Sequence, residues 1–151
     1  MIDTEDNFDT LEIGMTASYS QTITDADIKS FAEISGDNNP VHIDDEFAAD
    51  SQFGRRIAHG LLSSSFFSAL FGTKIPGPGC VYVSQSLKFL RPIYLDDTVN
   101  ASVTIKRIDK QKRRIFFNTV CTVKDKIMIL GKAELYLPKK LTGGKKQDNY
   151  N

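Results

Sequence analysis

Asp37 and His42 are the first residues whose types and spacing suggest chemistry. They flank Asn39-Pro40, and a bend at the proline can bring the two side chains together. An imidazole titrates near neutral pH, and a buried carboxyl can be shifted toward that range, so the pair can activate a water and transfer a proton beside a carbonyl. The same residue types also fit an ordinary loop, and composition alone favours the loop interpretation.

A second candidate site lies at Ala58-His59-Gly60, within a very apolar stretch. We expect Ile57 to Phe71 to form a helix, and the first turn of a helix carries unpaired N–H donors and the positive end of its dipole. A backbone N–H at Gly60 is therefore suited to polarise an acyl oxygen. Alternatively, Gly60 only permits close packing and His59 caps or packs. With no Gly-x-Ser-x-Gly elbow present, the serines of this helix indicate a close-packing face: Ser63, Ser64, Ser65 and Ser68.

Hydrophobic periodicity predicts the elements that position these residues. Alternation at residues 15–20 predicts a short strand, and Thr24-Asp-Ala-Asp27 is typical of a capping box at the start of a helix that Gly36 ends. Residues 35–45 are too rich in turn residues to be helical, and a short helical turn can follow at 46–50. Four strands are expected after the apolar helix, with Lys124-Asp-Lys126 as the tight connection between the last two: residues 81–89, 99–106, 115–123 and 127–137.

One enclosed helix followed by consecutive antiparallel strands predicts an α+β domain, in which a meandering sheet curls around a central helix and the N-terminal strand joins the same sheet. This is a single hot-dog fold. We place it at residues 11–138, after an acidic N-terminal segment at 1–10. Residues 139–151 are rich in Lys, Gly, Gln and Asn and predict a mobile polar tail, because they cannot bury enough apolar surface to offset the entropy of ordering.

Composition excludes several classes of protein. The chain has 151 residues, 40% of them apolar, and no apolar run of about 20 residues that a membrane span needs. Its 19 basic and 19 acidic side chains balance, which argues against a nucleic-acid partner. The start of the chain lacks a signal-peptide pattern, so we expect a cytoplasmic protein. Cys80 and Cys121 are expected to be reduced core residues, and a chain with only two histidines and no Cys-x-x-Cys spacing argues against a structural zinc site. Basic residues at 106–114 indicate a solvated turn, or else a phosphate-bearing ligand.

The order of these motifs resembles the MaoC-like dehydratases and R-specific enoyl-CoA hydratases. The resemblance covers about residues 10 to 138. It rests on Ser-Gly-Asp37-Asn-Asn-Pro40-Val-His42, the hydratase motif of that family, followed by His59-Gly60. Phe89-Leu-Arg91-Pro92 and Asp96-Asp97-Thr98-Val99 extend it. This order of motifs reverses the loop interpretation of Asp37 and His42.

The resemblance implies addition of water across a trans-2-enoyl thioester to give an R-3-hydroxyacyl thioester, or the reverse. Asp37 and His42 match the catalytic pair, and Gly60 matches the residue whose N–H receives the thioester oxygen. Ser68 falls where a serine assists in some members, and Asn39 and His59 are expected to contact the substrate. The family needs no metal and no redox cofactor. Its substrates are acyl-CoA or acyl carrier protein thioesters, and its members of this length are homodimers with the pocket between protomers.

Some features leave alternatives open. Arg55-Arg56 departs from the hydrophobic or acidic residues often found there, and can contact a carrier phosphate or simply face solvent. Phe66, Phe67 and Phe71 can narrow an acyl pocket or be plain core. A non-catalytic acyl-thioester binding domain and an acyl-CoA thioesterase are the competing functions, because a fold does not fix an activity.

Overall fold

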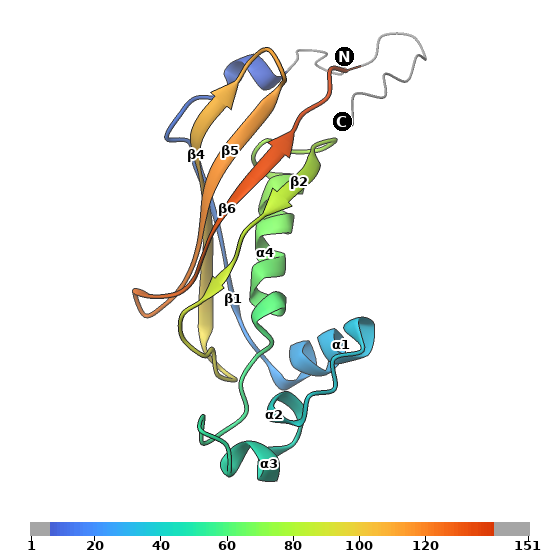
Figure 1. Cartoon of the computed structure of the whole chain (residues 1–151), viewed down its shortest axis with the longest axis vertical. Coiled ribbons are helices and arrows are strands. Elements are labelled where there is room, and N and C mark those ends of the chain that lie inside the picture. Colours follow the sequence, from blue (N-terminus) through green and yellow to red (C-terminus); the bar gives the residue numbers. More distant parts are fainter. Residues whose placement is uncertain (1–6, 141–151) are drawn as a thin grey trace.

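A computed structural model describes residues 7–140, and Figure 1 shows a curved sheet with one long helix along its inner face and a group of short helices beyond one end. The helices are η1 (Asn7–Thr10), α1 (Asp25–Ser35), α2 (Pro40–Ile43), α3 (Asp45–Ala49) and α4 (Gly60–Thr73). The strands are β1 (Thr16–Thr22), β2 (Val81–Gln85), β3 (Lys88–Phe89), β4 (Thr98–Asp109), β5 (Arg114–Val123) and β6 (Lys126–Tyr136).

The sheet is antiparallel with the order β1-β4-β5-β6-β2, and β3 also pairs with β6. The predicted meander is therefore confirmed for the last three strands, and β1 joins the same sheet as expected. Two details of the prediction were wrong. The expected strand at 81–89 is two strands, and β2 pairs with β6 across the sheet rather than with β4.

Gly131 on β6 explains the interruption between β2 and β3. A Cβ at this position would lie 1.9 Å from the carbonyl oxygen of Ser86, so only glycine lets the backbone of Ser86 approach this closely. Ser86 there donates its N–H to the carbonyl of Lys132 and accepts the N–H of Lys132 on its hydroxyl. Beyond this glycine, β3 pairs with β6 in the same register as Gln85 with Ala133.

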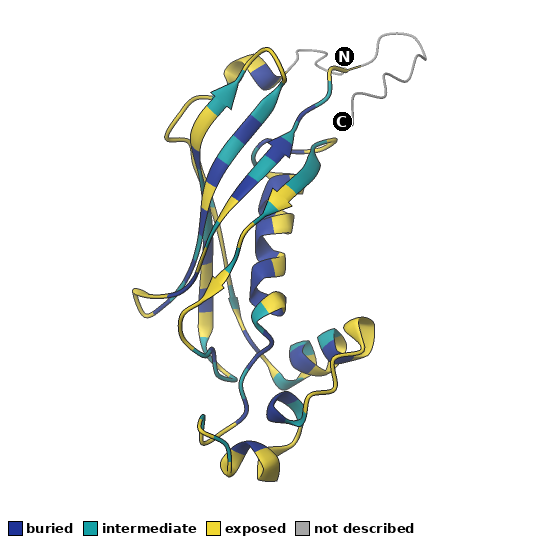
Figure 2. Ribbon diagram, viewed as in Figure 1, coloured by how far each residue is buried: buried dark blue, intermediate teal, exposed yellow. Residues whose placement is uncertain are grey.

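The core lies between α4 and the concave face of the sheet, where Figure 2 shows a continuous buried stripe along the helix. Phe67 and Phe71 are fully buried, and Phe71 meets the ring of Phe117 on β5 edge-on at 4.7 Å. Phe66 is also buried and packs against Tyr19. These phenylalanines are core residues. From η1, Phe8 also belongs to this core.

The start of α4 differs from the prediction. The helix begins at Gly60, because Ile57 forms an isolated antiparallel bridge with Tyr94 and the Ala58 N–H donates to the carbonyl of Ile93. Residues 57–58 are thus held in extended form against the segment that follows β3. The apolar periodicity of the helix cannot reveal this, since extended residues between two elements can be equally apolar.

The segment from α1 to α3 lies beyond the end of the sheet (Figure 1). Its capping box is confirmed: the Thr24 hydroxyl accepts the Asp27 N–H, the Asp27 carboxylate accepts the Thr24 N–H, and Gly36 ends α1 with φ of 77°. The expectation that residues 35–45 are not helical was wrong for α2. Pro40 occupies the first turn, and Asn39 caps it by accepting the Val41 N–H, which are favourable signals for a helix start.

Other sequence features are placed as follows. Lys110, Lys112 and Arg113 lie in the turn between β4 and β5, as expected for the turn interpretation, which was wrong for Lys106 and Arg107 on β4 and for Arg114 on β5. Cys121 is buried, which raises the pKa of its thiol to about 12, whereas Cys80 is only partly buried.

No helix within residues 7–140 is long and apolar enough to cross a membrane. Most of the expected polar tail, residues 141–151, lies outside the described residues.

Candidate active site

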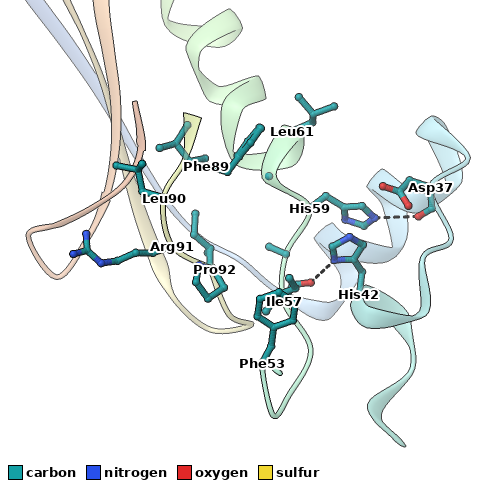
Figure 3. Close-up of a pocket in the computed structure, with 14 residues that line it drawn as sticks. Asp37, His42, Phe53, Ile57, His59, Leu61, Phe89, Leu90, Arg91 and Pro92 are labelled. Atoms are coloured by element: carbon teal, nitrogen blue, oxygen red, sulfur yellow. Dashed lines mark hydrogen bonds between the residues drawn. The ribbon is translucent and has the colours of Figure 1, made fainter. Parts of the chain in front are cut away.

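A cavity of about 410 Å³ opens between α2, the start of α4 and the segment that follows β3. Figure 3 shows Asp37 and His42 on one side of it and the apolar side chains of Phe89, Leu90 and Pro92 on the other. The lining is mostly apolar, as is usual for small-molecule sites. The lining residues are Asp37, His42, Phe53, Ile57, Ala58, His59, Gly60, Leu61, Phe89, Leu90, Arg91, Pro92, Ile93 and Ile129.

Two consecutive side-chain turns bring Asp37 and His42 to this cavity. The Asp37 carboxylate accepts the Asn39 N–H at 3.1 Å, and the Asn39 side-chain oxygen accepts the Val41 N–H at 3.2 Å. Asx turns of this kind bend the chain tightly. The bend places Asp37 before α2 and His42 on it, with both side chains at the same cavity. Asp37 remains exposed to solvent, whereas His42 is buried.

The hydrogen bonds of His42 fix its tautomer. Its Nδ1 lies 2.7 Å from the Ile57 carbonyl oxygen, which can only accept, so Nδ1 carries the proton. Nε2 is left with a free lone pair and can serve as a base. Burial is the largest cause that lowers the pKa of His42, and His59 lowers it further, while the bond to Ile57 and the charge of Asp37 oppose the shift. The imidazole is therefore neutral at neutral pH, as a base requires.

We predict that His42 titrates below the ordinary imidazole pKa of 6.5. The unfolded chain then binds the proton more readily than the folded chain, so the free energy of unfolding falls as the pH decreases from 6.5 toward the pKa of the folded state. An NMR titration can follow this directly, because the chain contains only two histidines and each can be assigned by substituting the other. Titration of His42 above 6.5 would contradict the burial argument.

His59 lies behind this pair and is only 2% exposed. Its Nε2 donates to the main-chain carbonyl of Asp37 at 3.0 Å, and its ring lies over that of His42 with centroids 3.9 Å apart. The ring of Phe31 also packs against the ring of His59, with the two centroids 4.8 Å apart. These contacts hold the backbone of Asp37 and the ring of His42 in place. The position of His59 thus favours support of the pair over the expected contact with substrate.

Gly60 is the first residue of α4 and lines the cavity. N–H groups in the first turn have no acceptor within the helix, and the helix dipole adds positive potential there. A Cβ at this position would lie 2.4 Å from Cε1 of Phe89, so the apolar wall of the cavity contacts the glycine directly. The cavity therefore combines a backbone donor with an apolar surface.

The other predicted contacts, Asn39 and Ser68, do not line this cavity. Asn39 is exposed, and its side-chain oxygen is used to cap α2. Ser68 is exposed on α4 and lines a separate hollow of about 380 Å³ between α4 and β2. Within this one chain, the structure therefore brings together Asp37, His42, His59 and Gly60, and leaves Asn39 and Ser68 outside.

Arg56 is a residue whose place the sequence did not reveal. The two expectations were a carrier phosphate or open solvent, and both were wrong, because Arg56 is only 8% exposed. Its guanidinium donates to the His42 carbonyl and to Asp25. Arg55, next to it, is exposed and stacks over the ring of Tyr94 at 4.0 Å. In the sequence, the one indication that Arg56 belongs to the site is that it directly precedes the Ile57-Ala-His-Gly motif.

Metal-ligating atoms of Asp37, His42 and His59 all lie within 4.8 Å of one another. Ligand atoms that share a tetrahedral zinc lie about 3.3 Å apart, given Zn–N bonds of about 2.0–2.1 Å. The two imidazole rings are stacked with an angle of 30° between their planes, and each ring already uses one nitrogen in a hydrogen bond to a main-chain carbonyl. The expectation that no metal is needed stays a prediction.

Comparisons with known proteins agree with this geometry. The model of the MaoC like domain matches residues 8–129. The chain is 44% identical over 131 residues to an (R)-specific enoyl-CoA hydratase from Rhodospirillum rubrum, covering 87% of this chain and 91% of that protein. A 3-hydroxybutyryl-CoA dehydratase from Methylorubrum extorquens is 41% identical over 88% of this chain and 85% of its own. A solved (R)-hydratase from A. caviae superposes with a TM-score of 0.83 at 36% identity, covering 85% of this chain and 98% of that one. The chain has the hot-dog fold, and it belongs to the MaoC-like domain family.

Proposed function

We propose that this protein is a hydro-lyase that adds water to trans-2-enoyl thioesters to give R-3-hydroxyacyl thioesters, or catalyses the reverse dehydration. The observation that carries this proposal is the pairing of Asp37 with the unprotonated Nε2 of His42 at one apolar cavity. The names of the relatives, an (R)-specific enoyl-CoA hydratase and a 3-hydroxybutyryl-CoA dehydratase, support the same reaction.

In the proposed mechanism, Asp37 and His42 hold one water beside the β-carbon of the substrate. His42 removes a proton from the water through Nε2 as the oxygen attacks the β-carbon. This proton passes from His42 to the Asp37 carboxylate and from Asp37 to the α-carbon, so both residues return to their starting state. A C–O and a C–H bond form, while one O–H bond and the π bond are lost. The reverse sequence is the dehydration.

The Gly60 N–H has the complementary task. An α-proton of a thioester is a poor acid, so negative charge that develops on the thioester oxygen must be stabilised while the base acts. One well-aimed donor in a dry site contributes about 3–4 kcal/mol to such a transition state. The position of Gly60 at the start of α4, with an apolar wall against it, supports this role.

Gly60→Ala is expected to lower kcat/KM for hydration about 10-fold, because the new methyl group must displace the ring of Phe89 and shift the acyl oxygen from the donor. Phe89 is half exposed and can move, so the melting temperature should change little. Steady-state kinetics and thermal melts of the purified variant check both parts. Wild-type kinetics in Gly60→Ala would contradict the expected displacement of the acyl oxygen by the new methyl group.

The proposed reaction can be separated from its competitors with one substrate. Crotonyl-CoA is mixed with the protein, and the enoyl absorbance and the free thiol are followed together. Loss of the enoyl absorbance without thiol release supports a hydratase. Thiol release indicates a thioesterase, and tight binding with neither change indicates a non-catalytic acyl-thioester binding domain; either result would contradict the proposal.

We also propose that the protein acts as a homodimer in the cytoplasm, on acyl-CoA or acyl carrier protein substrates, without metal or redox cofactor. The outer strands β1 and β2 leave sheet edges that can pair with another chain. Leu61, Phe89 and Leu90 at the cavity are 59%, 52% and 49% exposed, and a second copy that covered them would close the site. Light scattering should give twice the chain mass of 16.9 kDa, and a monomer at assay concentration would contradict this proposal.

A further inference from the structure

Arg56 connects three elements around the candidate site while being almost fully buried. Its Nε donates to the His42 carbonyl at 2.6 Å, and its Nη2 donates to the Asp25 carboxylate of α1 at 2.7 Å. Nη1 lies 3.7 Å from the Asp45 carboxylate of α3. A buried guanidinium is tolerated when its charge is paired and it is hydrogen-bonded, and these contacts supply two carboxylates and two short hydrogen bonds.

The same segment holds His42 from a second direction. The Ile57 N–H donates to the Val41 carbonyl at 3.3 Å, and the Ile57 carbonyl accepts Nδ1–H of His42 at 2.7 Å. Residues 56–57 are thus joined to residues 41–42 through backbone, ring and guanidinium together. Bonds from Arg56 and Ile57 therefore fix both the main chain and the ring of His42.

External contacts of this kind matter because α2 has only four residues. A helix of a single turn has almost no stability of its own, since nucleation fixes several residues for very few hydrogen bonds. The positive guanidinium at the C-terminal carbonyl of His42 also interacts favourably with the helix dipole. The orientation of His42 therefore depends on its partners more than on the helix that carries it.

From these contacts we infer that Arg56 is a positioning residue for the reaction proposed above: it holds α2 so that Nε2 of His42 faces the cavity. This inference rests on the proposed function for its kinetic consequence, but its structural consequence is independent of it. A lysine can make one of the two short bonds at a time, whereas the planar fork of arginine makes both, so lysine should replace it only in part.

Arg56→Met tests the inference, with Arg55→Met as the matched control, because Arg55 is exposed and contacts Tyr94 instead of α2. In Arg56→Met, kcat for crotonyl-CoA should fall about 10- to 100-fold with little change in KM, because the base is misplaced while the apolar wall is intact. Arg56→Lys should recover part of the loss. Arg55→Met should keep wild-type kcat.

The pKa and the tautomer of His42, measured by NMR, supply a second test. Neither should change if Arg56 only stabilises the fold. Titratable or charged groups reach His42 from three sides: Asp37 before α2, His59 before α4, and Arg56, which Asp25 and Asp45 neutralise in part. Removing Arg56 takes away the donor that holds the His42 carbonyl, so we expect α2 to loosen, the ring to become less buried and the pKa of His42 to rise. In wild type and Arg55→Met, nitrogen shifts should show a single Nδ1–H tautomer, whereas Arg56→Met should show a mixture.

The outcomes decide the inference separately from the proposed function. If wild-type protein does not hydrate crotonyl-CoA, the proposed function fails, and the tautomer and pKa of His42 still test the inference. If Arg56→Met folds and keeps both wild-type kcat and the wild-type His42 signals, the inference is wrong. If Arg56→Met does not fold, Asp25→Asn, which weakens the ion pairs of Asp25 with Arg56 and with Lys29, should give the same changes in smaller measure; unchanged His42 signals there would overturn it.

Discussion

His42→Ala should reduce the rate of crotonyl-CoA hydration by about 10²- to 10⁴-fold, the usual contribution of a positioned acid–base residue. The substitution removes the Nε2 lone pair of His42 at the cavity, whose direction is fixed by the bond from Nδ1 to Ile57. KM should change little, because the apolar wall that faces the acyl group is untouched. Steady-state kinetics measure both values.

The fold must survive this change for the result to be informative. Loss of the bond to Ile57 leaves one carbonyl without its partner, which costs about 1–3 kcal/mol when the group stays buried. A domain is stable by about 5–15 kcal/mol, so most of the protein should remain folded, as circular dichroism and a thermal melt can verify. A folded His42→Ala protein with near-normal hydration would refute the assignment of His42 as the base.

Asp37→Asn should give a loss of similar size, about 10²- to 10⁴-fold, for a different reason. Asparagine has the same shape, and its side-chain oxygen can still accept the Asn39 N–H that forms the turn. It has no carboxyl group, however, and cannot exchange a proton with the α-carbon. Because Asp37 is exposed to solvent, the free energy of unfolding should hardly change.

Asp44→Asn is the matched control for this variant. Asp44 caps α3 by accepting the Phe47 N–H, lies in the same segment and does not line the cavity, and asparagine is an equally good cap. Asp44→Asn should keep wild-type kinetics. If Asp37 and His42 act on the same water, the double variant should be little slower than the slower single variant. Full activity in Asp37→Asn would rule out its proton-transfer role.

Much of the fold could be predicted because it depends on local patterns. The Thr24 capping box and Gly36 define α1, and the alternation of apolar and polar residues defines the long strands. The pairing of β2 with β6 could not be predicted from such patterns, because the alternation within a strand does not show which strand lies beside it. The interruption between β2 and β3 depends on the close approach of Ser86 to Gly131, which joins residues far apart in the chain.

The same distinction applies to the candidate site. Asp37, His42 and Gly60 were found because their motifs are short and ordered along the chain, and the structure places all three at one cavity. Arg56 was misjudged because its partners, Asp25 and the His42 carbonyl, are distant in sequence or belong to the backbone. A charged residue is expected at the surface unless a partner is known, and partners appear only in three dimensions.

The central claim is that one water is shared by a carboxyl and an imidazole at the β-carbon of an enoyl thioester. Incubation of the wild-type protein with crotonyl-CoA in D₂O, followed by chiral analysis and mass spectrometry of the product, tests it most directly. We predict R-3-hydroxybutyryl-CoA with deuterium at the α-carbon and no free thiol. An S product, hydrolysis of the thioester, or unchanged crotonyl-CoA would contradict it.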